Sequence, residues 1–237
     1  PTAAIWHNTN PSHQDPSQAW FLAPTDLQAI KAAGVTFVAS MLERVIEEQA
    51  RGDASRAEAV RDAKMDVVLD KVTRMEDGLA TICFATGMGA IGAVFQALLK
   101  AGDHVICSQS VFGSVIPMFS REFAKFGVET TFVPQTDIAA WQAAVRPNTK
   151  LLFAETPTNP LTEVCDIQAL ADIAHNAGAF LAVDNCFATP VLQRPVRMGA
   201  DFIIHSGTKF LDGQGRVMAG ALCASQQMVT EKFLPIL

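Results

Sequence analysis

From residue 79 onward, short apolar runs alternate with longer segments that carry a helical pattern. Runs such as 79–85 (LATICFA), 104–108 (HVICS) and 179–184 (AFLAVD) have the length and composition of buried strands. Strands that alternate with helices of roughly 10–15 residues are typical of βαβ units, which build a parallel sheet with helices on both faces. The alternation therefore predicts an α/β fold with a mostly parallel sheet flanked by helices. The expected strands are 79–85, 104–108, 128–134, 150–155, 179–184, 201–206 and 217–224, and the expected helices are 86–102, 111–127, 136–145 and 166–178.

The composition excludes several classes of protein. With 49% hydrophobic and 18% charged residues, the chain has the apolar content of a folded domain rather than of a disordered one. A net charge of -6 gives no phosphate-seeking field, so we expect no nucleic-acid partner. No apolar run reaches the roughly 18 residues that cross a bilayer, and no signal peptide is recognisable at the N-terminus. The scattered cysteines fit reduced thiols, and we expect a cytoplasmic protein without membrane contact.

The N-terminal part of the chain differs in texture from the rest. Charged residues and strong helix formers predict two exposed amphipathic helices there, at about 39–51 and 54–76. We interpret the run of charges as a solvated helix face. The sequence therefore predicts a helical N-terminal segment, 1–64, followed by an α/β domain, 65–237.

Residues that follow the strands are the first candidates for a site, because parallel sheets bind ligands outside the carboxyl ends of their strands. The turn 85–89 (ATGMG) follows the first expected strand and opens a helix. Its small residues would let backbone N–H groups face an anion. By itself this turn fits a phosphate cradle and a tight connection between strand and helix equally well.

Two further strand ends carry ionisable groups. Asp184 ends its apolar run, where a buried carboxylate needs a cation or hydrogen bonds, although a structural cap would also satisfy it. Lys209 follows another run and is flanked by the hydroxyls of Ser206 and Thr208. This pattern suits a Schiff-base lysine beside a phosphate, although a lysine after a strand is more commonly a plain surface residue.

The combination of these features is more specific than any one of them. A phosphate-type turn, a carboxylate at a strand end and a hydroxyl-flanked lysine 25 residues later match what pyridoxal 5'-phosphate requires. The lysine reacts with the aldehyde, and the turn and the hydroxyls hold the phosphate. The carboxylate keeps the pyridine nitrogen protonated, so that the ring can accept electrons. The sequence therefore predicts a pyridoxal 5'-phosphate site.

Five stretches, in chain order, carry a resemblance to a known family: Thr86–Met88, Val111–Gly113, Glu155–Pro160, Val183–Asn185 and His205–Lys209. With them, residues 65–237 resemble the large domain of the Cys/Met-metabolism family of pyridoxal-phosphate enzymes. This resemblance implies the aspartate-aminotransferase-like fold, also called fold type I. It covers most of the chain, and the order of the stretches makes a chance match remote.

The resemblance also implies roles for individual residues. Lys209 would form the Schiff base, Asp184 would pair with the pyridine nitrogen, and Asn159 would lie near the ring hydroxyl. Where the family usually stacks a tyrosine on the cofactor ring, this chain has Phe112, which keeps the stacking surface and lacks the phenolic hydroxyl. The residues that would hold the phosphate are Gly87, Met88, Ser206 and Thr208.

Within the family, the stretch 209–216 (KFLDGQGR) most resembles O-succinylhomoserine sulfhydrylases. This implies a γ-replacement that makes homocysteine from O-succinyl- or O-acetylhomoserine and sulfide. The partners implied are a small-molecule amino-acid substrate and further copies of the chain, since the family forms homo-oligomers, typically tetramers. Cystathionine γ-synthases and γ-lyases use the same apparatus and stay open as alternatives.

Residues 1–63 do not resemble the family's N-terminal arm, which carries a tyrosine and an arginine that reach a neighbouring subunit. The segment 32–44 is instead similar to a piece of the fumarylacetoacetate-hydrolase family, so a metal-dependent hydrolase is a second hypothesis and a non-catalytic fragment is a third. We expect no metal site from the residues present. The family's smaller C-terminal domain would begin after Leu237, so we expect weak cofactor binding and little turnover from this chain.

Overall fold

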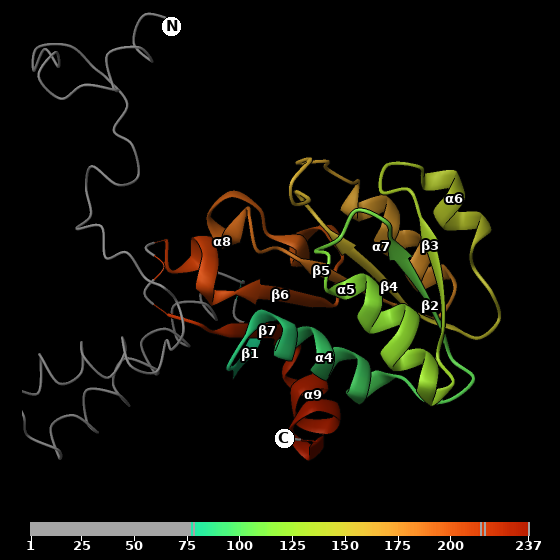
Figure 1. Ribbon diagram of the computed structural model, residues 1–237, viewed down its shortest axis with the longest axis horizontal. Helices are drawn as coiled ribbons and strands as arrows, with labels where there is room; N and C mark the ends of the chain where they lie inside the picture. Colours follow the sequence, from blue (N-terminus) through green and yellow to red (C-terminus); the bar gives the residue numbers. More distant parts are fainter. Residues whose placement is uncertain (1–76, 78, 214, 216, 237) are drawn as a thin grey trace, which may run out of the picture. The chain divides into compact units, whose positions relative to one another are not determined.

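The computed structural model describes residues 77, 79–213, 215 and 217–236. The helices expected at 39–51 and 54–76, and the boundary after residue 64, lie outside this part. In the described part, seven strands form one sheet in the order β1-β7-β6-β5-β4-β2-β3 (Figure 1). The strands are β1 (Ala80–Phe84), β2 (His104–Ser108), β3 (Glu129–Val133), β4 (Thr149–Glu155), β5 (Phe180–Asp184), β6 (Phe202–Ser206) and β7 (Gly220–Ala224).

The sheet is mostly parallel, and every strand overlaps a run that the sequence predicts, with β4 beginning one residue earlier than expected, at Thr149. Neighbouring strands from β3 through β2, β4 and β5 to β6 are parallel. β7 is antiparallel to both of its neighbours, β1 and β6. The predicted α/β class with a mostly parallel sheet is therefore confirmed.

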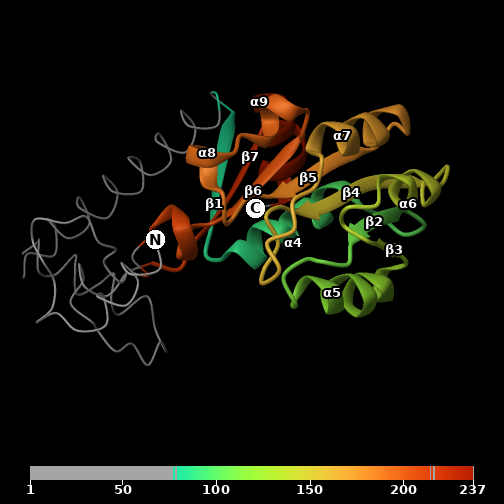
Figure 2. The same cartoon turned by 90° about the horizontal axis from the view of Figure 1, so that it is seen from above.

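Helices cover both faces of the sheet. Figure 2 shows α7 on one side and α4 and α5 on the other. Of the helices described here, none combines the length and the apolar character that a membrane span requires. The α-helices are α4 (Gly87–Leu98), α5 (Val115–Pro117), α6 (Ile138–Ala143), α7 (Ile167–Asn176), α8 (Thr189–Leu192) and α9 (Gln226–Met228). Short π- or 3₁₀-helical segments span Met118–Glu122, Phe123–Phe126, Pro195–Met198, Gly207–Leu211, Val229–Phe233 and Leu234–Ile236.

The apolar runs of the inner strands are continuous because these strands are buried on both faces, whereas the outer strands β1 and β3 are only partly buried. In β4, Leu151 and Phe153 belong to the core on the α4 side, whereas Leu152 and Ala154 belong to the core on the α7 side. This is the two-residue alternation of a strand. With helices above and below the sheet, neither set of side chains has to be polar.

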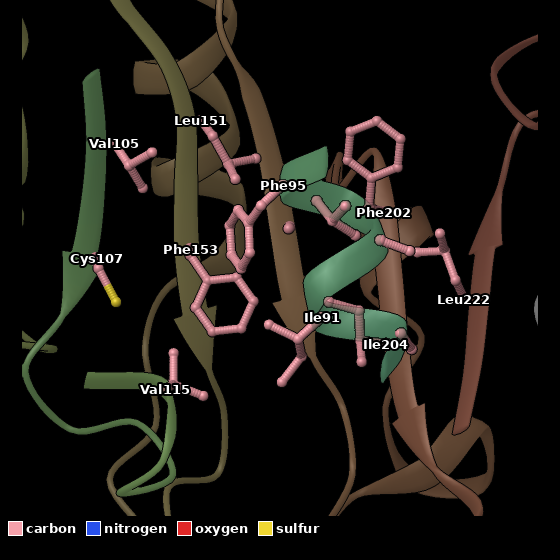
Figure 3. Close-up of a cluster of buried hydrophobic side chains, with 14 of the residues drawn as sticks. Ile91, Phe95, Val105, Cys107, Val115, Leu151, Phe153, Phe202, Ile204 and Leu222 are labelled. Atoms are coloured by element: carbon pink, nitrogen blue, oxygen red, sulfur yellow. The ribbon is translucent and has the colours of Figure 1, made fainter. Parts of the chain in front are cut away.

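The core on the α4 side fixes where that helix begins. Ile91 and Phe95 of α4 are buried against Phe153, Phe202 and Leu222 of the sheet (Figure 3). Burying one such side chain stabilises a fold by about 1.5–3 kcal/mol. The ring of Phe95 lies 5.8 Å from that of Phe153, centroid to centroid. This packing holds the N-terminus of α4 at the edge of the sheet where β1 ends.

The helix expected at 111–127 is shorter than predicted. α5 begins at Val115, and the preceding residues form a loop that carries Phe112. The backbone N–H of Phe112 donates a hydrogen bond to the side chain of Glu155, at the end of β4. A long-range hydrogen bond thus replaces the helical start that local propensity favours. At the other end, the segment stops at Gly127, whose φ of 78° is left-handed.

Candidate cofactor site

Five of the predicted site segments meet at one edge of the sheet. β1, β2, β4, β5 and β6 all run in the same direction, so their carboxyl ends lie at the same edge. β1 leads to the turn 85–89, the loop after β2 carries Phe112, and the loop after β4 carries Asn159. β5 ends in Asp184, and β6 leads to Lys209. This is the edge at which open α/β sheets bind their ligands.

The start of α4 has the form of an anion cradle. Thr86 caps the helix, because its Oγ1 accepts a hydrogen bond of 2.9 Å from the N–H of Gly89. The N–H groups of Gly87 and Met88 lie in the first turn, where a helix offers them no acceptor. Ser206 lies beside them, since a Cβ built on Gly87 would be 3.1 Å from the Cβ of Ser206. The N–H groups, the helix dipole and the hydroxyl together suit a phosphate.

Thr208 is held beside this cradle by the residue that precedes β7. Its Oγ1 accepts a hydrogen bond of 3.2 Å from the N–H of Ala219, and the N–H of Gly207 donates to the carbonyl of Ala219 at 2.7 Å. The second contact of the Thr208 hydroxyl, to the carbonyl of Ala219, measures 3.5 Å and lies at the limit of hydrogen bonding. The Thr208 hydroxyl can therefore donate a hydrogen bond to a better acceptor, such as a phosphate oxygen.

Gly220 belongs to the cradle although the sequence analysis missed it. A Cβ on Gly220 would lie 2.1 Å from the carbonyl oxygen of Thr86 and 2.8 Å from the backbone nitrogen of Gly87. Only glycine allows β7 to approach the turn this closely. The two segments are far apart in the chain, so no local signal marks this position.

Replacing Gly220 with alanine is expected to lower the free energy of unfolding by about 3 kcal/mol, because the atoms in its way are backbone atoms that cannot turn aside. Urea denaturation of variant and wild type measures the change. Gly92 of α4 is the matched control, since a Cβ there would meet nothing within 4 Å. Gly92→Ala is expected to raise stability by about 0.5–1 kcal/mol through helix propensity. Equal stability of Gly220→Ala and wild type would contradict the close approach.

Two buried carboxylates end neighbouring strands. Glu155 and Asp184 are partners in the β4–β5 register, and they are only 5% and 8% exposed. Burial, followed by the charge of Glu155, raises the pKa of Asp184 to about 7. A hydrogen bond of 3.0 Å from the N–H of Cys186 acts in the opposite direction. Within the described part of the chain, no lysine, arginine or histidine forms an ion pair with Asp184.

Glu155 is the second site residue that the sequence analysis left without a role. Its Oε2 accepts a hydrogen bond of 2.5 Å from the N–H of Phe112, and its Oε1 accepts one of 3.0 Å from the N–H of Asn159. Burial raises the pKa of Glu155, and the two hydrogen bonds lower it. The ring of Phe112 is 42% exposed at this edge of the sheet. A carboxylate at the end of a buried strand is the same signal that pointed to Asp184, and it would have found Glu155.

Lys209 lies on the exposed side of the site. Its backbone, with φ of −99° and ψ of −125°, departs from helical geometry inside the segment Gly207–Leu211, and its side chain is exposed. The next residue, Phe210, contacts Phe187 edge to face, with the ring centroids 5.3 Å apart. This contact joins the segment after β6 to the segment after β5.

Cys186 links Lys209 electrostatically to Asp184. Burial, followed by the Asp184 carboxylate, raises the pKa of the Cys186 thiol to about 12, while the positive charge of Lys209 acts in the opposite direction. Both charged groups therefore lie within electrostatic reach of one sulfur atom. A thiol with so high a pKa is no nucleophile near neutral pH, so we interpret Cys186 as a packing residue.

Two surface hollows of the described part lie away from this edge. One is lined by residues of α4 and of the segment 114–128, and the other is lined by residues of β3 and by Arg146. None of the predicted site residues lines either hollow. The candidate site is therefore assigned from the groups that meet at the strand ends.

The residues at this edge fit pyridoxal phosphate by their chemistry. The helix start and the hydroxyls of Ser206 and Thr208 suit a phosphate, and the half-exposed Phe112 ring suits the flat face of a pyridine. Asp184, a buried carboxylate without a cation partner in the described part, suits a protonated ring nitrogen. Lys209 supplies a primary amine for the aldehyde. The role of each residue stays a prediction.

The chain belongs to the family of Cys/Met metabolism PLP-dependent enzymes, whose family model matches residues 30–235. The resemblance drawn from the sequence is thereby confirmed, and pyridoxal phosphate is the cofactor of this family. The match begins inside the segment 1–64 and includes residues 32–44, on which the hydrolase hypothesis depended. Those residues lie outside the described part.

Curated relatives within the family catalyse several related reactions. The chain is 49% identical over 162 residues to the O-succinylhomoserine sulfhydrylase of Pseudomonas aeruginosa. It is 40% identical over 161 residues to the cystathionine gamma-lyase of Bacillus subtilis, and 38% identical over 166 residues to an L-methionine gamma-lyase of Fusobacterium nucleatum. The aligned parts cover 68–70% of this chain and 40–42% of each relative, so the chain spans well under half of their length.

Proposed function

We propose that this protein is a pyridoxal-phosphate-dependent transferase of sulfur amino-acid metabolism, which makes homocysteine from an acylated homoserine and sulfide. The observation that carries the proposal is the meeting of Asp184, Lys209 and the α4 start at one sheet edge. A carboxylate suits the ring nitrogen of the cofactor, an amine suits its aldehyde, and a helix N-terminus suits its phosphate. When bound, the cofactor supplies an electron sink for the substrate.

Each residue would contribute a distinct physical effect. The N–H groups of Gly87 and Met88 and the hydroxyls of Ser206 and Thr208 bind the phosphate. Asp184 accepts a hydrogen bond from the ring nitrogen and keeps it protonated, since a carboxylate next to a cation is stabilised in its charged form.

Phe112 would cover one face of the cofactor ring, and Asn159 would lie near the ring hydroxyl. The amine of Lys209 would hold the cofactor through its aldehyde, and it would also carry protons between the substrate Cα, its Cβ and the side of the departing γ-acyl group.

The choice of γ-replacement by sulfide rests on the relatives. Identity to the sulfhydrylase of Pseudomonas aeruginosa is 49%, against 38–40% for the two lyases. The stretch 209–216, which begins at the proposed Schiff-base lysine, points to the same subclass. A γ-lyase or a γ-synthase activity is the second candidate, favoured by the relatives that carry those names, among them a probable cystathionine gamma-synthase at 40% identity.

The proposed reaction is tested by a substrate panel in the presence of pyridoxal phosphate. Since we expect little turnover from this chain, the panel compares its substrates with one another. We expect homocysteine from O-succinylhomoserine and sulfide at a higher kcat/KM than cystathionine from the same ester and cysteine, and than 2-oxobutyrate from methionine or cystathionine. O-Acetylhomoserine in parallel identifies the acyl group. A higher kcat/KM with methionine or cystathionine would overturn the sulfhydrylase assignment in favour of a lyase.

We also propose that the active form is a homo-oligomer in the cytoplasm, as the family resemblance implies. Supporting this, the segments that follow β4, β5 and β6 expose apolar side chains, which a second copy could cover. These side chains are Leu161, Val164, Val191, Leu192 and Phe210. The five cysteines are all unbridged, which fits a reducing compartment.

A further inference from the structure

One carboxylate joins two loops that are separate in the chain. Glu155 ends β4 with its side chain almost fully buried, and each of its oxygens accepts one backbone N–H. One N–H comes from Phe112, in the loop after β2, and the other from Asn159, in the loop after β4. An ionised carboxylate is purely an acceptor, so it can take one of these N–H groups on each of its two oxygens. Hydrogen bonds to a charged acceptor are the strong ones.

The backbone around Glu155 is held from a third side. Its carbonyl oxygen accepts a hydrogen bond of 2.6 Å from the side-chain amide of Gln135, which follows β3 and is itself buried. The carboxylate therefore projects from a strand end that cannot easily shift. The two loops therefore share one anchor, which is attached to the end of β4.

The two loops held by Glu155 carry the groups proposed to contact the cofactor ring. Phe112 would cover one face, and Asn159 would lie at the ring hydroxyl. Asp184, the proposed partner of the ring nitrogen, is the register neighbour of Glu155 on β5. One side chain thus lies next to all three of the ring contacts, while it is assigned no contact with the ring itself.

We propose that Glu155 is a positioning residue, which fixes the ring-binding loops through the N–H groups of Phe112 and Asn159. The inference rests on the proposed cofactor site and adds to it the element that arranges that site before the ligand arrives. Pre-positioned groups do not have to be ordered on binding, so the loss of the clamp should appear as weaker binding and a less uniform ring orientation.

A second effect of Glu155 has the opposite sign. Its negative charge repels that of Asp184 and contributes to the raised pKa of Asp184. Removing the charge would therefore leave Asp184 more fully ionised and favour a protonated ring nitrogen. If electrostatics dominated, a neutral residue at position 155 would tighten cofactor binding. If positioning dominates, as we propose, the same change weakens it, and the direction of the effect decides between the two.

Glu155→Gln is the sharpest variant, because it keeps the shape of the side chain and replaces one of the two acceptors with a donor. In the cofactor-free wild type, hydrogen exchange should show protected amides at Phe112 and Asn159. In the variant, at least one of them should exchange about 10-fold faster or more, the usual worth of a hydrogen bond to a charged group. Titration of the variant with pyridoxal phosphate should give a dissociation constant about 10-fold higher, with a weaker visible circular dichroism band from the bound cofactor.

Glu129→Gln is the matched control, since it makes the same chemical change at an exposed ion pair on β3. It should leave both amides, the dissociation constant and the dichroism band as in wild type. Glu155→Asp keeps the charge and shortens the reach. We expect it to lose protection at one amide and to weaken binding as well, which a purely electrostatic role would not produce. It also serves as the test variant if Glu155→Gln does not fold.

Three results would overturn the inference. The first is fast exchange of both amides in wild type. The second is a Glu155→Gln protein that binds the cofactor as tightly as wild type, or more tightly, with an unchanged dichroism band. If Glu155→Gln lowered the unfolding midpoint but left cofactor binding and the dichroism band as in wild type, Glu155 would have a structural role only, which also counts against positioning. Third, a wild type that protects both amides and binds no pyridoxal phosphate would refute the proposed function, and the role assigned to Glu155 with it.

Discussion

Replacing Lys209 with alanine is expected to abolish the covalent attachment of pyridoxal phosphate and, with it, all turnover. Among the described lysines, Lys209 alone follows a strand end at the edge where the candidate site lies. Without a primary amine beside the aldehyde, the cofactor can be held only by its phosphate and its ring. The measurement is the visible absorbance of protein freed of excess cofactor on a desalting column, before and after borohydride reduction.

The matched control for this prediction is Lys150→Ala. Lys150 lies at the start of β4, the opposite end of the strand from the candidate site, and is exposed. This variant should retain the absorbance band of wild type and its sensitivity to borohydride. An Lys209→Ala protein that gives a reducible adduct in the yield of wild type would remove Lys209 from its proposed role.

Replacing Asp184 with asparagine is expected to separate the stability of the protein from its function. Its pKa is raised from 3.8 to about 7 in the folded protein, so the folded state binds this proton more tightly than the unfolded state does. In the cofactor-free protein, ionising Asp184 therefore costs more free energy in the folded state than in the unfolded state. The free energy of unfolding falls as pH rises from about 4 through 7. At pH 8 the asparagine variant should be more stable by up to about 4 kcal/mol.

The same change should damage function, since a neutral amide cannot hold the ring nitrogen protonated. Loss of such an electrostatic partner commonly lowers the rate by about 100-fold or more. Urea denaturation of the cofactor-free proteins at pH 5 and pH 8, together with turnover of the loaded proteins, measures both effects. A variant whose stability follows the pH dependence of wild type would show that Asp184 is not the buried carboxylate that titrates. An unchanged rate would exclude it from the cofactor site.

The fold was predictable because its inner strands are buried on both faces. Runs such as 151–154 and 179–183 are apolar without interruption, and the segments between the strands contain glycine and polar residues. The order of the strands was not predictable in the same way. β1 pairs with β7 at one side of the sheet, and this contact between distant parts of the chain leaves no local pattern.

Some residues of the candidate site were predictable from the sequence, and others depend on contacts between distant parts of the chain. Asp184 and Lys209 stand at strand ends, where a charged side chain among apolar neighbours attracts attention in the sequence itself. Gly220 matters through its close approach to Thr86, and the loop at Phe112 is held outside the expected helix by a hydrogen bond from its N–H to Glu155. These are tertiary contacts, and local propensity carries no information about them.

The central claim is that the amine of Lys209 is the group that attaches pyridoxal phosphate. The most direct test is to load the wild-type chain with the cofactor, reduce it with borohydride, and locate the modification by peptide mass spectrometry. The account predicts one dominant modified peptide, the one that contains Lys209, carrying the mass of the reduced cofactor. Modification distributed over other lysines, or a Lys209 peptide that stays unmodified in protein saturated with the cofactor, would contradict it.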